Sequence, residues 1–155
     1  MSVTEGDKSP AFTLPATGGR TVSLAACEGK PFILYFYPKA DTPGCTKEAC
    51  AFQEALPQLG QIGVTVIGVS KDKMPALEKF AAKYDLKFPL ASDEAGMVVE
   101  AFGAWIEKSM YGRKYMGIDR STFLIDKAGS IAKVWRGVKV PGHAKAVMDA
   151  VATLA

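Results

Sequence analysis

The sequence predicts an α/β fold in which helices flank a mixed central sheet and a β-hairpin extends it at the N-terminal end. Three observations lead to this prediction. A segment with helical periodicity lies between two apolar segments, which is the order of a parallel βαβ unit. Two later strand candidates are separated by only five residues, too few for a crossover helix, so they must pair antiparallel. An amphipathic helix then closes the chain.

The first half of the chain supplies the hairpin and the βαβ unit. Residues 12–14 and 20–23 are short extended segments around Gly18-Gly19, a dipeptide typical of a hairpin turn. Residues 32–37 are apolar or aromatic throughout, as expected of a buried strand, and residues 64–69 are predicted to form a second one. Between them, one helical face is formed by Cys45, Ala49, Phe52, Leu56 and Leu59, which recur at spacings of four, three, four and three.

The second half supplies two helices, the antiparallel pair and the closing helix. Helices are predicted over residues 75–84 and 97–102, strands over 121–125 and 131–136, and the last helix over 141–154. The inward face of that last helix is predicted to consist of Ala144, Val147, Met148, Val151 and Leu154. A βαβ half followed by a ββα half is the order of the thioredoxin fold. We therefore expect residues 1–155 to form a single thioredoxin-like domain.

Composition excludes several classes of function. The net charge is only +3 and the chain has no run of Lys and Arg, so no nucleic-acid partner is expected. The apolar runs are far shorter than the roughly 20 residues of a membrane span, so no membrane partner is expected either. The N-terminal stretch MSVTEGDKSPAF is polar and has no apolar signal segment, which favours a cytoplasmic protein. In such a protein, paired cysteines are redox-active or metal-binding more often than structural.

The stretch PKADTPGCTKEAC places a cysteine where a helix begins. We expect Thr42 to be the N-cap residue, Pro43 the first helical residue, and Cys45 to lie in the first turn. The Thr42 hydroxyl would then lie near the backbone N–H of Cys45. The free N–H groups and the positive end of the helix dipole favour an anion there, and the reactive form of cysteine is the thiolate.

A helix N-terminus alone does not make a fast cysteine enzyme. An ordinary thiol is roughly 3% ionised at pH 7, and lowering its pKa to about 6 would raise that fraction only about thirtyfold. A cation from elsewhere in the chain is needed to stabilise charge in the transition state. The candidates are Arg20, Arg113, Arg120 and Arg136. Arg120 directly precedes the strand candidate 121–125 and can project toward the site, but the pattern does not choose it over Arg113.

The remaining cysteines and the single histidine have less distinctive surroundings. Cys50 lies about 140° around the helix from Cys45, off the core face. Cys27 is expected to be passive, and His143 is expected to be a solvated residue at the start of the last helix. One histidine excludes most His-based metal sites. A plant-type iron–sulfur run would need a cysteine at position 53, where the chain has Gln53, so no metal site is predicted.

These motifs resemble the peroxiredoxins. Residues 38–45 match the signature P-x-x-x-T-x-x-C. The fuller YPKADTPGCTKEAC, the opening GDKSPAFTLPATGG and the stretch FGAWIEKSMYGRKYMGIDRSTFLID resemble the Q-type subfamily, also called bacterioferritin comigratory protein. The resemblance implies a thiol peroxidase that reduces hydrogen peroxide and organic hydroperoxides without a metal or organic cofactor.

The resemblance also implies a role for each residue of the motif. Cys45 would be the peroxidatic cysteine, which is oxidised to a sulfenic acid. Thr42 and Arg120 would orient the peroxide and stabilise the thiolate and the leaving oxygen. Pro38 would shield the pocket, and Glu48 would help to hold Arg120.

Cys50 matches the resolving cysteine of subfamily members that keep one in the same helix. It would close an intramolecular disulfide that thioredoxin then reduces, and a monomer is expected because this step needs no partner chain. Ile106 stands where the family often has a small residue, which leaves the pocket rim open to question. The alternative from another class is a non-catalytic thioredoxin-fold binding module that uses Cys45 and Cys50.

Overall fold

The computed structural model describes residues 3–154, which form nine strands, four α-helices and two short 3-10 turns. The strands are β1 Thr13–Ala16, β2 Arg20–Ser23, β3 Phe32–Phe36, β4 Thr65–Ser70, β5 Leu90–Ser92, β6 Trp105–Met110, β7 Arg113–Ile118, β8 Ser121–Ile125 and β9 Ile131–Trp135. The helices are α1 Pro43–Gln61, α2 Met74–Lys83, α3 Met97–Ala101 and α4 His143–Ala152, and the turns are η1 Thr17–Gly19 and η2 Ala25–Cys27.

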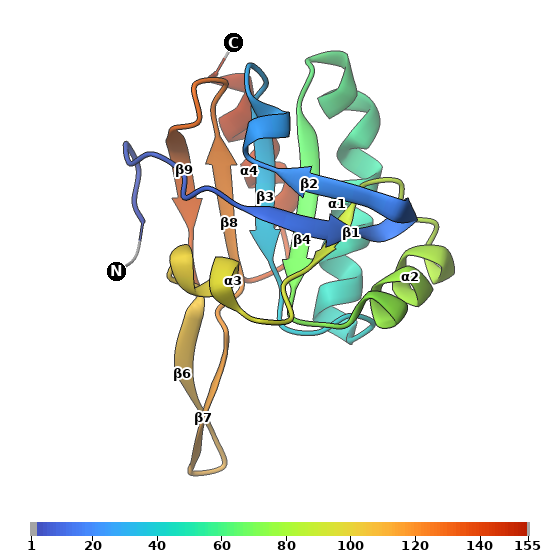
Figure 1. Cartoon of the computed structure of the whole chain (residues 1–155), viewed down its shortest axis with the longest axis vertical. Coiled ribbons are helices and arrows are strands. Elements are labelled where there is room, and N and C mark those ends of the chain that lie inside the picture. Colours follow the sequence, from blue (N-terminus) through green and yellow to red (C-terminus); the bar gives the residue numbers. More distant parts are fainter. Residues whose placement is uncertain (1–2, 155) are drawn as a thin grey trace.

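Seven of these strands form one mixed sheet in the order β2-β1-β5-β4-β3-β8-β9 (Figure 1). The parallel pairing of β3 with β4, joined through α1, confirms the predicted βαβ unit. The antiparallel pairing of β8 with β9 confirms the second half of the prediction. The N-terminal hairpin β1–β2 extends the sheet through β5. Strands β6 and β7 stand apart as a separate two-stranded hairpin.

Strand β3 lies at the centre of the protein because it is buried on both faces. Successive side chains of a strand point to opposite sides. Phe32, Leu34 and Phe36 face a core cluster that includes α3, and Ile33 and Tyr35 face a second cluster that includes α1, α2 and α4. A strand covered on both faces reads as a continuous apolar run, which is why the sequence predicts it correctly.

Three strands have no counterpart in the sequence prediction. Strand β5 is only three residues long. Strands β6 and β7 are exposed over much of their length and mix apolar with charged residues on both faces, so they lack the one-sided apolar alternation that identifies a half-buried strand. No helix within residues 3–154 is long and apolar enough to cross a bilayer.

The last helix is shorter than predicted, and one of its expected core residues is not buried. Val147 and Val151 are buried as expected. Leu154 lies beyond the end of α4 and is 37% exposed, so its inward assignment is wrong. The helical spacing that places it on the core face holds only while the helix continues.

His143 also differs from the expectation, because it is buried rather than solvated, with only 6% of its surface exposed. It precedes the buried Val147 by four residues and Val151 by eight, so it lies on the same core-facing side of α4. Its Nε2 lies 2.8 Å from Thr122 Oγ1, and its ring meets those of Phe52 and Trp135 edge-on. Burial, with the nearby positive charge of Arg120, lowers the pKa of His143 to about 4.

We therefore predict that His143 makes the folded state sensitive to acid. Because the pKa of His143 is lower in the folded chain than the usual 6.5, the unfolded chain binds the proton first, and stability falls as pH drops from about 6.5 to 4. A His143→Gln variant should not show this decrease in the free energy of unfolding, which is on the order of 1–3 kcal/mol. Urea unfolding of both proteins at a series of pH values measures it. A wild type and variant that lose stability in parallel would contradict the prediction.

Candidate active site

Helix α1 begins at the carboxyl end of β3, where sites of open α/β sheets form (Figure 1). The connecting loop is held before the helix starts. The Ala40 N–H donates to Asp72 Oδ2, and the Asp41 carboxylate accepts hydrogen bonds from Lys83 and Tyr84 of the α2 region. These contacts position Cys45, the third residue of α1, which is buried and free of any disulfide.

The helix start differs in one respect from the expected cap. Thr42 occupies the N-cap position with an extended backbone, as predicted. Its hydroxyl, expected near the N–H of Cys45, instead donates to the carbonyl oxygen of Lys39 at 2.8 Å and makes no capping hydrogen bond. The first hydrogen bond of the helix runs from Thr46 N–H to Thr42 O. The first turn therefore offers its free N–H groups and the positive end of the helix dipole beside Cys45.

Arg120 supplies the cation at this site. It lies between β7 and β8, and its Nη2 is 3.4 Å from Cys45 Sγ. The other terminal nitrogen, Nη1, is 2.7 Å from Glu48 Oε1. Gly44 makes room for this approach, because a Cβ there would come within 3.2 Å of Nη2. Arg113, which the sequence left as an alternative, lies exposed at the start of β7.

Glu48 is the most unusual charged residue of the site, because it is a carboxylate with only 1% of its surface exposed. One oxygen pairs with Arg120, and within the described chain Oε2 has no hydrogen-bond partner. Burial raises the pKa of Glu48 to about 7, although the charge of Arg120 and the hydrogen bond to it act in the opposite direction. Glu48 is therefore subject to two opposed effects, burial that favours the neutral carboxyl and Arg120 that favours the carboxylate.

Two buried tyrosines face the same region, and the sequence analysis did not single them out. Tyr35 and Tyr37 alternate along the chain at β3, so both point toward α1, and their ring centroids are 5.5 Å apart. Within residues 3–154, neither hydroxyl has a hydrogen-bond partner. Burial first, and then the acidic groups Tyr37, Glu48 and Cys45, raise the pKa of Tyr35 well above its usual value. Their spacing of two residues in an otherwise hydrocarbon strand is the signal that would have identified them.

The other residues proposed from the sequence lie at varying distances from this centre. Cys50 is half-buried in α1 and carries a free thiol. Pro38 is exposed just after β3, and Ile106 is half-buried on β6. Within residues 3–154, no group of three or more His, Cys, Asp or Glu side chains is arranged to hold a metal ion.

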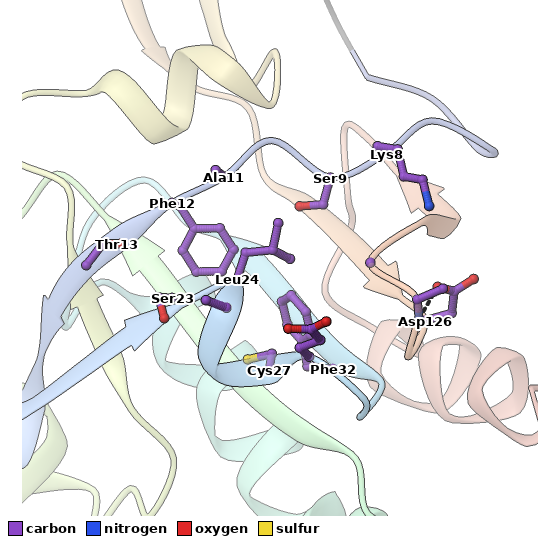
Figure 2. A pocket seen from close by; sticks show the side chains of 14 residues that line it. Lys8, Ser9, Ala11, Phe12, Thr13, Ser23, Leu24, Cys27, Phe32 and Asp126 are labelled. Carbon is purple, nitrogen blue, oxygen red and sulfur yellow. Dashed lines mark hydrogen bonds between the residues drawn. The ribbon is translucent and has the colours of Figure 1, made fainter.

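Cys27 lies at the other end of β3, away from Cys45 and Arg120. The thiol is half-buried in η2, and burial raises its pKa, which disfavours the reactive thiolate. Figure 2 shows it lining a pocket of about 490 Å³ together with Phe12, Leu24 and Phe32. Since Phe32 is the first residue of β3 and Cys45 follows its last, the whole strand separates this cavity from the Arg120 site.

The sequence of this chain is similar to those of known proteins over most of its length. The sequence pattern of the AhpC/TSA family matches residues 5–134. A protein of Coxiella burnetii, by name a bcp peroxiredoxin, is 51% identical over 148 residues, which cover 96% of this chain and 98% of that protein. Peroxiredoxin Bcp of Bacillus subtilis is 44% identical over 154 residues, with 99% of this chain and 96% of that protein covered.

The solved structures agree with these matches. A cysteine-to-serine mutant of PrxQ from Xylella fastidiosa superposes with a TM-score of 0.92 at 38% identity, covering 99% of this chain and 97% of that one. The bacterioferritin comigratory protein of Xanthomonas campestris superposes with a TM-score of 0.88 at 41% identity, covering 92% and 90% of the two chains. That structure was described for its alkyl peroxide reduction activity.

The raised pKa of Glu48 predicts that Glu48→Gln changes the pH dependence of stability. A carboxyl whose pKa is about 7 in the folded chain and near 4.5 in the unfolded chain favours folding when it is protonated. The advantage is full below pH 4.5 and is lost as pH rises through 7. Between pH 5 and pH 8, the free energy of unfolding of the wild type should therefore fall by on the order of 2–3 kcal/mol relative to that of Glu48→Gln. Denaturant unfolding at both pH values checks this, and a difference that does not change with pH would contradict it.

Proposed function

The chain belongs to the AhpC/TSA family and is a peroxiredoxin of the Q type, a thiol peroxidase, and from this we propose that it reduces hydrogen peroxide and organic hydroperoxides through Cys45. The observation that carries the proposal is the guanidinium of Arg120, 3.4 Å from the Cys45 sulfur at the start of α1. Extension to organic hydroperoxides is supported by the alkyl peroxide reduction activity of the Xanthomonas campestris relative.

In the proposed first step, the Cys45 thiolate attacks the nearer oxygen of the peroxide. The S–O bond forms as the O–O bond breaks. The cysteine is oxidised to a sulfenic acid, and the leaving oxygen departs as water or an alcohol after taking up a proton. Negative charge moves from sulfur to the leaving oxygen during this step. A donor that contacts both positions is worth more in the transition state than in the resting thiolate.

Arg120 is suited to that donor role because its position is fixed. Glu48 holds Nη1 at 2.7 Å and leaves Nη2 directed at the cysteine sulfur. We assign Glu48 as a positioning residue for Arg120. Thr42 and the free N–H groups of the first turn are proposed to orient the peroxide, and Pro38 is proposed to cover the pocket from the loop before α1.

Cys50 is proposed to resolve the sulfenic acid. Its thiol attacks the Cys45 sulfur, water leaves, and an intramolecular disulfide forms. Two residues five apart in an intact helix have Cα atoms about 8–9 Å apart and side chains about 140° apart. A disulfide needs Cα atoms within about 7 Å and converging Cβ directions. The first turns of α1 must therefore unwind before the bond can form.

The same opening presents the disulfide to a reductant. We propose that thioredoxin or a similar dithiol protein attacks it by thiol–disulfide exchange and returns both cysteines to the reduced state. Because both cysteines belong to one helix, the cycle needs no second copy of the chain, and we propose that the enzyme acts as a monomer.

The proposal predicts that Cys45→Ser abolishes peroxide reduction in an assay coupled to thioredoxin and its reductase. The matched control is Cys27→Ser, which removes a thiol at the far end of β3 and should leave turnover within about twofold, because burial disfavours its thiolate. Turnover above a few per cent in Cys45→Ser would overturn the assignment. Peroxide reduction absent from the wild type as well would favour a non-catalytic binding module.

The proposed disulfide predicts a change in backbone protection within α1. Backbone amides of residues 45–52 should exchange hydrogen much faster in the oxidised protein than in the reduced one, because the turns that join the two cysteines have unwound. Amides of β3 should be unchanged and serve as the internal reference. Peptide mass spectrometry after one equivalent of peroxide identifies the pairing in the same sample. A disulfide form with undiminished protection over residues 45–52 would contradict the Cys45–Cys50 pairing.

A further inference from the structure

The β6–β7 hairpin projects from the body of the protein and has no strand partner beyond itself (Figure 1). It leaves the body at the end where β3 and β4 finish and α1 begins, so it shares that end with the Arg120 site. Arg120 follows the last residue of β7 by only two positions. A two-stranded hairpin is at most marginally stable by itself in water, so its extension into solvent calls for an explanation.

The tip of the hairpin carries an exposed aromatic side chain in a conformation that suits it poorly. Met110 pairs with Arg113, which leaves a two-residue turn at Tyr111 and Gly112. Both turn residues have positive φ, 52° for Tyr111 and 77° for Gly112, as in a type I′ turn. Asn and Gly favour the first position of such a turn, whereas a bulky aromatic residue is an outlier there. Tyr111 is nevertheless 98% exposed, so packing within the chain does not account for it.

The apolar side chains near the tip are not confined to one face. The register places Met110 and Tyr115 on one face of the ribbon and Met116 on the other, with Tyr111 at the end. All four belong to the large hydrophobic residues that remain exposed in the described chain. A flat protein surface would cover one face only. A fluid phase that surrounds the tip covers both faces and the end together.

The charges of the hairpin complement an anionic phase. Lys108, Arg113 and Lys114 stand against a single carboxylate, Glu107, and within residues 3–154 none of these side chains takes part in an ion pair. Arg113 and Lys114 lie beside the turn, whereas Lys108 and Glu107 are neighbours farther back along β6. Long basic side chains can keep their charge at the headgroups while Tyr and Met enter the interface.

From this arrangement we infer that the β6–β7 hairpin docks the protein on the surface of an anionic phospholipid bilayer, with Tyr111 and Met110 entering the interface. The earlier expectation of no membrane partner rested on the lack of a spanning segment, and a docked tip needs none. The consequence for turnover rests on the proposed function. Docking would turn the Cys45 end of the protein toward the bilayer, where hydroperoxides of phospholipid chains are found.

Vesicle sedimentation tests the docking directly. We expect the protein to bind vesicles of phosphatidylcholine with about 30% phosphatidylglycerol at least tenfold more tightly than vesicles of phosphatidylcholine alone, and to be released as salt is raised. Tyr111→Asn should weaken binding at least fivefold. It should leave thermal stability equal or higher, since Asn suits the turn. Equal binding of the wild type to both vesicles, or of Tyr111→Asn and the wild type to the anionic ones, would overturn the inference.

A charge-matched pair of triple variants separates the hairpin from the net charge. Lys108→Gln/Arg113→Gln/Lys114→Gln should lose binding to the anionic vesicles at least tenfold. The control replaces three exposed lysines outside the hairpin with Gln and so changes the net charge equally; they are Lys8, Lys30 and Lys127. Its affinity for the anionic vesicles should fall less than about threefold. Equal losses in the two triples would show that net charge alone attracts the protein and would overturn the hairpin assignment.

Turnover distinguishes the docking proposal from the peroxidase proposal. Tyr111→Asn should reduce phospholipid hydroperoxide in vesicles several-fold more slowly than the wild type, while both reduce dissolved hydrogen peroxide equally. A wild type that binds vesicles and reduces no peroxide would refute the peroxidase proposal and keep the docking. A wild type that reduces hydrogen peroxide and binds no vesicle would overturn the docking. In that case, slower turnover of Tyr111→Asn at limiting thioredoxin would assign the hairpin to a protein partner.

Discussion

The site depends on one interaction, the ion pair between the buried carboxylate of Glu48 and the guanidinium of Arg120, which also contacts the sulfur of Cys45. Glu48 and Cys45 lie three residues apart on the core side of α1, and Arg120 reaches both from the other half of the chain. Removing Glu48 from water is costly, and the ion pair offsets that cost only because both groups are held in place. The cost shows in the raised pKa of the carboxyl. The arrangement ties the first turn of α1 to the start of β8.

The rest of the fold supports this contact by making β3 rigid. All five residues of β3 are buried, and the strand pairs in parallel with β4 on one side and antiparallel with β8 on the other. The helix that carries Cys45 therefore starts from the fully buried, doubly paired strand of the sheet, and the residue that precedes β8 is Arg120. Tyr35 and Tyr37 face α1 with hydroxyls unpaired in the described chain, which leaves this side of the core less than fully satisfied. Such a region is less costly to open than a wholly apolar one.

The proposed cycle places two opposed demands on α1. Binding and activation of the peroxide need an intact first turn, because the free N–H groups and the dipole exist only in a helix. Disulfide formation needs the same turn to unwind, because Cys45 and Cys50 point apart in a helix. Gly44 in the first turn and Pro57 within the helix are weak helix formers that lower the cost of this opening. The loop contacts of Asp41 and Ala40 favour the closed arrangement while the cysteine is reduced.

Elements whose pattern is local can be predicted from the amino-acid sequence. The continuous apolar run of β3, the periodicity of α1, the short gap between β8 and β9, and the Thr-Pro-Gly-Cys helix start each follow from the spacing of residues near in the chain. Which arginine meets Cys45 depends on the folded chain, because Arg113 begins β7 and Arg120 follows its end, and the sequence of that strand has no one-sided apolar pattern. The folded chain also determines what surrounds His143, because Thr122, Phe52 and Trp135 reach its ring from three other elements. Glu48 illustrates the division most clearly: its position in the helix is visible in the sequence, but its raised pKa comes from packing against residues that the chain brings together only on folding.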